Sequence, residues 1–470
     1  MTEQLLLTEG VDPQSPTSED ADEIGIKDDV LPLRDKDLPP IVREIVTNAP
    51  PSRKLPAFVA CLAPLCVLAT RIRLKYYYDS RPSALLLQVI IEAPQSSGKQ
   101  FAADIERLLL DNTIKARDME QRRLEQDYRE KKKRRKANEK LEEEPKTTIR
   151  VIPATISKTV LVKRADFYER NLGDVLSFWM FAEELAQVTD AGKQGYSNLR
   201  TIMRTAYDLG SRFGMDFASD NSYSAIVDIN ICSMFCSTPS ALDDYMDKKA
   251  IEGGNITRTI LCQLDDQIGA DGAIFKPYTP SQLQTISSTL GLIMNDCYTA
   301  DGALKPELNL DMSWLDKDVR RWCLEKGKQA LESGSVALDV FRKRSSVSAF
   351  RVAALCYYLY CLNPTETPEP LAQKRARRIY LYMSDYILNM LLKRWGKRFE
   401  ELVSKRNKEE DENTRRPRLL DNLPKQFTRD QLLALMQRLE VSSPARVLLS
   451  QWKNNQWINI LSKNQFEKLI

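Results

Sequence analysis

The chain has 470 residues, of which 43% are hydrophobic and 29% charged, so it is long enough for two or three ordinary soluble domains. It contains no histidine, which excludes a histidine-based triad, a histidine general base and a histidine-bound metal. The formal net charge is only +4, so any affinity for nucleic acid must come from local basic patches.

Cysteine usage and hydropathy predict a cytoplasmic protein with no membrane association. The nine cysteines lie mostly in apolar runs without a C-x-x-C pair, as expected for buried, reduced thiols. The longest apolar stretch, Ala57–Ala69, is too short to span a bilayer and contains Pro64. The acidic N-terminus lacks a signal-peptide pattern, and residues 1–36 are expected to be disordered.

A helical lead-in is expected between Pro39 and Leu74, and the apolar strand Leu85–Ile91 follows it. This strand leads into Ala93-Pro-Gln-Ser-Ser-Gly-Lys99, after which a helix opens. In a phosphate-binding loop of this order, backbone N–H groups at the helix N-terminus and a lysine face the anion. The residues expected to contact ATP are Pro94, Ser96, Ser97, Gly98, Lys99 and Gln100.

The loop departs from the G-x-x-x-x-G-K-[ST] pattern at two positions. Ala93 stands at the first glycine, and Gln100 replaces the hydroxyl residue that holds Mg²⁺ in such loops. The loop therefore indicates nucleotide binding and leaves hydrolysis open.

Residues 112–147 form a highly charged insertion that predicts a long exposed helix or a helical hairpin. One interpretation is a solvated surface. The other is a basic prong that contacts a nucleic-acid backbone, because six consecutive positive charges lie within it. These are Lys131, Lys132, Lys133, Arg134, Arg135 and Lys136.

Further strands alternate with helical patterns, which predicts an α/β fold with a mainly parallel sheet. The strands are expected at Thr148–Pro153, Val175–Phe181, Ala225–Phe235 and Thr257–Leu264.

The strand Val175–Phe181 is followed by Glu183 and Glu184. In nucleotide-hydrolysing enzymes one such carboxylate holds Mg²⁺, here Glu183, and the other orients the attacking water, here Glu184. The alternative is that the pair only caps the next helix. The catalytic assignment requires this strand to lie next to Leu85–Ile91 and both glutamates to lie near the loop.

Two later positions have a catalytic and a structural interpretation. Thr238 ends a strand and is either a sensor of the γ-phosphate or an N-cap before Pro239. Arg258 follows two glycines. It either contacts a phosphate, in its own subunit or in a neighbouring one, or forms a surface ion pair. Other arginine candidates are Arg200, Arg204, Arg212, Arg344 and Arg351.

The remainder of the chain has helical patterns and a distinct tail. Helices are expected at 280–300, 313–335, 338–362 and 370–403, followed by a charged loop at 404–424. In 425–470 a Thr-capped helix, a second helix and a hairpin suggest either a winged helix or a closing helical cap. Arg446 and Lys453 on the second helix are candidate DNA contacts.

The order of these motifs over roughly residues 38–360 resembles an uncharacterised family of primase/helicase-like P-loop proteins from integrative and mobilisable elements of Bacteroidetes. The resemblance rests on Ile91–Lys99, the charged insertion, and the segments 151–157, 181–184, 236–239 and 255–258. It implies Lys99 as phosphate contact, the glutamates as acidic pair, Thr238 as sensor and Arg258 as arginine candidate. It also implies ATP-driven replication or mobilisation of the element beside a separate primase or relaxase.

The sequence therefore predicts a RecA-like P-loop core at 37–276, a helical region at 277–424 and a winged-helix-like tail at 425–470. The expected function is a DNA-dependent ATPase, a helicase or translocase that uses ATP and Mg²⁺ and forms a homo-oligomer such as a hexameric ring. The alternatives are a non-hydrolysing nucleotide-binding adaptor and a DNA-binding regulator of the element.

Overall fold

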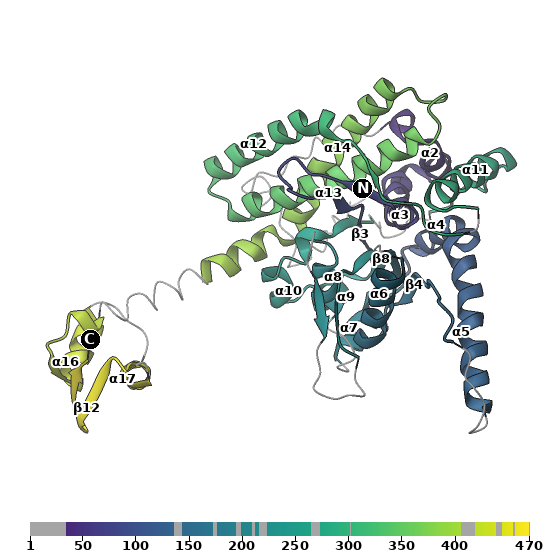
Figure 1. Ribbon diagram of the computed structural model, residues 1–470. Helices are drawn as coiled ribbons and strands as arrows, with labels where there is room; N and C mark the ends of the chain where they lie inside the picture. Colours follow the sequence, from purple (N-terminus) through teal and green to yellow (C-terminus); the bar gives the residue numbers. More distant parts are fainter. Residues whose placement is uncertain are drawn as a thin grey trace, which may run out of the picture. The chain divides into compact units, whose positions relative to one another are not determined.

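The computed structural model describes residues 34–135, 143–172, 176–193, 199–208, 212–215, 223–264, 273–300, 302–405, 419–438, 444–454 and 456–469. The chain divides into two units, Met1–Lys397 and Arg398–Ile470 (Figure 1). Most of the segment expected to be disordered lies outside the described residues, and Asp35–Asp37 forms a short 3-10 helix, η1. The predicted helical region belongs mostly to the first unit.

The centre of the first unit is a parallel five-stranded sheet, which confirms the predicted α/β class. Its three inner strands are buried on both faces, as expected when helices cover both sides. The strand order is compatible with a RecA-like core. From edge to edge the strands are β4 (Val151–Pro153), β5 (Ser177–Ala182), β8 (Asn230–Ser237), β3 (Gln88–Glu92) and β9 (Ile260–Gln263).

The predicted neighbourhood of β5 and β3 is wrong. β8 lies between them and pairs in parallel with both, Ser237 beside Glu92 and Phe235 beside Ala182. Because neighbouring strands lie about 4.8 Å apart, the ends of β5 and β3 are separated by about 10 Å. The apolar pattern of each strand specifies that it is buried but does not specify its neighbours.

Helix α3 (Lys54–Leu68) packs across one face of the sheet and contacts β3, β5, β8 and β9. The segment Pro51–Leu68, which begins before the predicted apolar stretch, is long and apolar enough to cross a membrane by length and composition. However, 78% of it is buried inside the protein, as in the core helix of a soluble protein.

The expected helices after the sheet are present and form a second layer (Figure 1). α13 is buried along most of its length and packs against both α12 and α14. Arg351 of α13 donates to the carbonyl oxygens of Leu86 and Tyr207 at 3.2 and 3.0 Å, which ties this layer to the sheet. The helices are α11 (Pro280–Cys297), α12 (Asp316–Ser333), α13 (Val336–Cys361) and α14 (Glu369–Leu391).

The charged insertion contains one long helix. α4 (Gln100–Leu110) passes through a π-helical turn into α5 (Ala116–Arg134). The start of α5 is fixed to β4, because Asp118 accepts the backbone N–H of Arg150 at 2.8 Å. The last turns of α5 are exposed.

Several strands of only two or three residues were not predicted, because so short an apolar pattern is hard to distinguish from a loop. β1 (Ile72–Leu74) pairs with β2 (Ser83–Ala84) and β10 (Leu308–Asn309). The expected strand Ala225–Phe235 is split, and its first part, β7 (Ala225–Val227), forms a hairpin with β6 (Phe213–Met215).

The second unit has its own core, which includes Phe427, Leu432, Trp452 and Phe466. Thr428 caps its first helix as predicted, because its Oγ1 accepts the N–H of Gln431 at 3.3 Å. The predicted terminal hairpin is present, and its second strand also pairs with a strand before the helices. The elements are β11 (Gln426–Thr428), α16 (Arg429–Arg438), α17 (Ala445–Asn454), β12 (Ile458–Ser462) and β13 (Gln465–Lys468).

Candidate nucleotide site

The loop after β3 turns through two residues in the left-handed region. Gly98 has φ +73° and Ser96 has φ +62°. Glycine adopts this conformation without a steric penalty, so Gly98 suits the turn that leads into α4. Since α4 begins at Gln100, the N–H groups of its first turn lie directly after the loop, where an anion is favoured.

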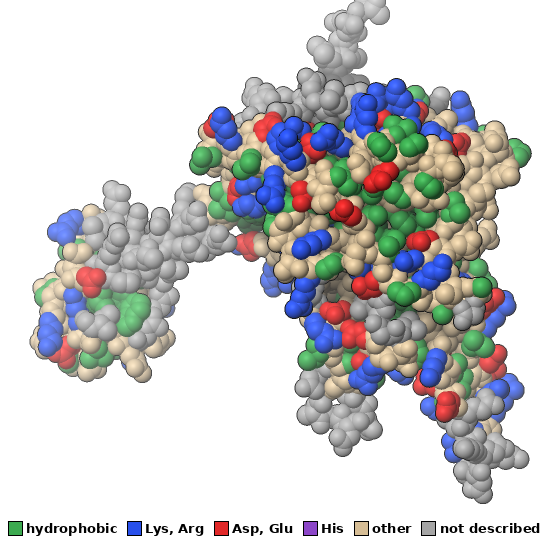
Figure 2. Space-filling model, turned by 45° about the horizontal axis from the view of Figure 1, so that its top comes forward, with side chains coloured by type: hydrophobic (Ala, Val, Ile, Leu, Met, Phe, Trp, Pro, Cys, Tyr) green, Lys and Arg blue, Asp and Glu red, His purple; other side chains and the backbone are tan. Residues whose placement is uncertain are grey.

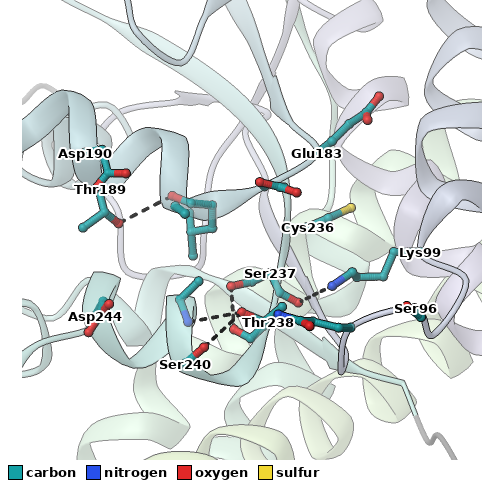
Figure 3. Close-up of a pocket in the computed structure, with 15 residues that line it drawn as sticks. Ser96, Lys99, Glu183, Thr189, Asp190, Cys236, Ser237, Thr238, Ser240 and Asp244 are labelled. Carbon is teal, nitrogen blue, oxygen red and sulfur yellow. Dashed lines mark hydrogen bonds between the residues drawn. The ribbon is translucent and has the colours of Figure 1, made fainter.

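Lys99 folds back over the loop. Its Nζ donates to the carbonyl oxygens of Ala93 and Pro94 at 3.1 and 3.4 Å. It also donates to the carbonyl oxygen of Ser237 at 3.2 Å (Figure 3). Partial burial lowers the pKa of Lys99, while the Cys236 thiol and the Glu184 carboxylate act to raise it. Neutral carbonyl groups hold the ammonium at the mouth of the loop, and a phosphate would bind it more strongly.

A pocket of about 540 Å³ lies at the carboxyl ends of the strands. It brings Lys99 together with the acidic pair and Thr238, which follow β3, β5 and β8, strands that are neighbours in the sheet but not consecutive in the chain (Figure 3). In open α/β sheets this edge is the usual place for a ligand. The polar lining residues are Gln95, Ser96, Lys99, Glu183, Glu184, Thr189, Asp190, Ser237, Thr238, Ser240 and Asp244.

Both glutamates are exposed and line this Lys99 pocket. Oε1 of Glu183 lies 3.6 Å from Nη2 of Arg107 on α4, an exposed pair of little energetic weight. The carbonyl of Glu184 accepts the N–H of Gln187 at 3.1 Å, so the pair also begins α7 (Leu185–Lys193). The separation of β5 from β3 by β8 is evidence against the catalytic assignment of the two glutamates. Their position in the same pocket as Lys99 is evidence for it.

Glu183 and Glu184 could hold a magnesium ion only together with the phosphates of a bound nucleotide. Within the described part of the chain, no three Cys, Asp or Glu side chains cluster to hold a metal by themselves. Mg²⁺ is commonly held by one or two carboxylates, several waters and the phosphates of a substrate. Glu183 and Glu184 would supply the protein's share of that shell.

Thr238 is an N-cap and a pocket residue at once. Its Oγ1 accepts the N–H of Ala241 at 3.3 Å and lies 3.3 Å from Oγ of Ser240 (Figure 3). The cap begins α9 (Pro239–Tyr245). The structural interpretation is therefore confirmed, and the sensor role stays a prediction.

Several predicted contacts have structural partners instead. Ser97 Oγ donates to the Pro94 carbonyl at 2.7 Å, which closes the loop on itself. The Gln100 amide donates to Asp104 Oδ1 at 3.4 Å, along the outside of α4. Pro94, Ser97, Gly98 and Gln100 do not line the pocket.

Arg258 lies at the other end of the sheet, in the 3-10 turn that precedes β9. Its side chain is only 10% exposed and is ion-paired with Asp208, which also binds Arg344 at 2.9 Å. A second bond joins Arg258 to the carbonyl of Gly254 at 2.8 Å. The structure does not bring Arg258 to the Lys99 pocket of the same chain.

Sequence reasoning missed Asp190, Ser240 and Asp244, which line the pocket from α7 and α9. Ser240 and Asp244 are four residues apart on α9 and therefore lie on the same face of that helix. Cys236 also lines the pocket, but burial raises its pKa to about 12, so the thiol stays protonated at neutral pH.

The predicted basic contacts lie on helix surfaces. Lys131 to Arg135 are exposed at the end of α5, where Arg134 pairs with Glu130 at 3.6 Å, and Lys136 lies outside the described residues. In the second unit, Arg446 and Lys453 are exposed on α17.

No protein-family model and no curated protein matches the chain.

Proposed function

We propose that the chain is an ATP-binding, DNA-dependent ATPase with a RecA-like P-loop core, acting as a helicase or translocase. The observation that carries the proposal is the single pocket shared by Lys99, Glu183, Glu184 and Thr238. These residues follow three parallel strands, so the fold rather than the local sequence brings them together. Phosphoryl transfer needs such a lysine, a metal-binding carboxylate and a residue that positions water.

The intervening strand β8 suits this chemistry. It places the end of β5, which precedes the acidic residues, about 10 Å from the end of β3. A phosphate chain and its metal ion need space between the lysine and the carboxylates. The strand order is therefore compatible with the proposal, but the predicted adjacency was wrong, and the assignment of the acidic pair depends on the shared pocket alone.

DNA is the proposed partner because basic groups gather locally on a nearly neutral chain. Residues 425–470 contain seven Lys and Arg and only three Asp and Glu. The order of strand, two helices and hairpin in this unit supports a winged helix, in which the second helix, here α17, would enter the major groove. The exposed end of α5 is a second proposed contact.

The cellular role follows from the resemblance of the motifs and remains part of the proposal. The chain would act in the cytoplasm, in the replication or mobilisation of a mobile genetic element, beside a primase or relaxase. A homo-oligomer such as a hexameric ring would allow Arg258 to act on the nucleotide of a neighbouring subunit, and this requires its ion pair with Asp208 to open.

One observation favours a non-hydrolysing adaptor as the second candidate. Gln100 stands where a hydroxyl residue would hold Mg²⁺, and its amide bonds Asp104 instead of lining the pocket. In that case the pocket would bind nucleotide as a signal, and the DNA-binding surfaces would carry the function.

The nucleotide site is tested by the affinity for ATP, measured by calorimetry. Lys99→Ala should weaken binding at least tenfold and leave the fold intact, because Lys99 is only partly buried and contacts neutral carbonyls. Lys248→Ala removes an exposed lysine outside the pocket and should change nothing. Equal ATP affinity of all three proteins would refute the nucleotide site.

A further inference from the structure

The loop between β1 and β2 carries three consecutive tyrosines, Tyr76 to Tyr78. Tyr76 is buried, its hydroxyl lies 2.7 Å from Ser346 Oγ, and its ring meets that of Phe350 at 5.1 Å. The backbone N–H of Asp79 donates to the Tyr76 carbonyl at 2.8 Å and closes the turn. The loop is therefore fixed on α13 through its first tyrosine.

The other two tyrosines present their rings at the surface. Tyr78 is 62% exposed and Tyr77 is half-buried. Their ring centres are 4.9 Å apart at an interplanar angle of 73°, and each lies 4.8 Å from the ring of Tyr76. Arg320 of α12 lies 5.0 Å from the Tyr77 ring. An aromatic platform on a fixed support is thus open to a planar ligand.

A groove runs past this platform. One hollow of about 440 Å³ is lined by Lys75 and Tyr77, and another of about 310 Å³ by Arg81. The two share Arg73, Pro82 and Asn309, so they are continuous. Figure 2, in which the top of the molecule in Figure 1 comes forward, shows Lys and Arg side chains interspersed with Asp and Glu over the face of the helical layer.

The groove is lined by five carboxylates and three cations, but Glu307, Asp208 and Asp228 are paired with arginines. Glu307 is paired with Arg73 at 2.7 Å, and Asp208 is paired with two arginines. Lys75, Arg81 and Arg320 are exposed, and none forms an ion pair within the described part of the chain. Asp311 and Asp316 also line the groove, so stacking on the rings must carry much of any affinity.

We propose that this tyrosine groove (Lys75, Tyr77, Tyr78, Arg81 and Arg320) binds single-stranded DNA. Bases stack on Tyr77 and Tyr78, while the three cations contact the phosphates. Stacking platforms combined with a basic groove are characteristic of proteins that bind single strands without sequence preference. The inference rests on the proposed function in taking DNA as the partner, and it names a surface separate from the Lys99 pocket.

The stacking role is tested with the full chain and a fluorescently labelled oligothymidylate, by anisotropy. Tyr77→Ala with Tyr78→Ala should weaken binding about tenfold or more, whereas Tyr77→Phe with Tyr78→Phe should keep most of it. Tyr128→Ala removes a half-buried tyrosine on α5, beside the competing basic surface, and serves as the control. Urea unfolding verifies that each variant remains folded.

The role of the cations is tested by the salt dependence of the same binding. Lys75→Ala and Arg81→Ala should each reduce the log–log slope by about 0.7, and the tyrosine variants should leave the slope unchanged. Lys328→Ala, on exposed α12 surface outside the groove, is the matched control.

The outcomes separate this proposal from the proposed function. Wild-type affinity in the double Tyr→Ala variant overturns the groove, even if the chain turns over ATP in response to DNA. Loss of affinity in that variant supports the groove, even if no ATP is hydrolysed. Tighter binding of single-stranded RNA or of duplex DNA at these tyrosines overturns the assignment of single-stranded DNA.

Discussion

Arg394, near the end of the helical layer, forms a buried ion pair with Glu92, the last residue of β3. The Arg394 Nε lies 3.1 Å from Glu92 Oε1, and the two side chains are 1% and 4% exposed. Nη2 of Arg394 also binds Asp243 of α9 at 2.9 Å, and Gln263 of β9 donates to the other Glu92 oxygen at 2.7 Å. One guanidinium therefore connects the helical layer to the strand before the loop and to the helix capped by Thr238.

Breaking this pair should destabilise the first unit strongly. Arg394→Met leaves Glu92 buried without its cation, which costs about 3–5 kcal/mol of unfolding free energy. Lys393→Met, at the exposed neighbouring position, should change the unfolding free energy by less than about 0.5 kcal/mol. Urea unfolding of both variants measures the difference, and equal stability would show that the pair contributes nothing.

Asp118 should make stability depend on pH in the acidic range. Burial raises its pKa from 3.8 to about 6, against the opposing effect of the N–H groups it accepts from Arg150 and Val151. Because the folded state then holds the proton more tightly than the unfolded state, this group's contribution is lost as pH rises from about 4 to 6.

The pH effect can be isolated with Asp118→Asn, which removes the titration and keeps an acceptor oxygen. The wild type should lose about 2 kcal/mol more than the variant between pH 4 and pH 7, as followed by urea unfolding. Parallel pH profiles for the two proteins would mean that Asp118 titrates normally.

The basic surfaces should affect DNA binding differently. Neutralising Lys131 to Lys136 should lower affinity for all sequences alike and flatten the salt dependence, because each lost phosphate contact removes about 0.7 from the single-strand slope. Removing residues 425–470 should instead reduce any preference for duplex DNA. Filter binding with single-stranded and duplex probes compares the two, and unchanged binding in both would leave these segments as solvated surface.

Features set by residues close together in the chain were predictable from the sequence, whereas the order of the strands in the sheet was not. The turn at Gly98, the acidic residues after β5 and the cap at Thr238 depend on neighbours in the chain, so short motifs indicated them. The position of β8 between β3 and β5 depends on which buried strands pair, and all of them have similar apolar sequences.

Long-range partners explain the remaining differences. Arg258 was a candidate for phosphate binding, but its partner Asp208 lies 50 residues away in the chain. No sequence motif indicated the role of Arg394, because its partner Glu92 is 302 residues away in the chain. A lone arginine in a sequence does not reveal whether a carboxylate or a ligand neutralises it.

The central claim is that the Lys99 pocket turns over ATP in response to DNA. The full chain should release phosphate from ATP, faster with single-stranded DNA. Glu184→Gln should still bind ATP but lose turnover by at least a hundredfold, since the residue that orients water is lost. Glu252→Gln, an exposed glutamate outside the pocket, should behave as the wild type. Phosphate release that is absent from the wild type with DNA present, or unchanged in Glu184→Gln, would contradict the account.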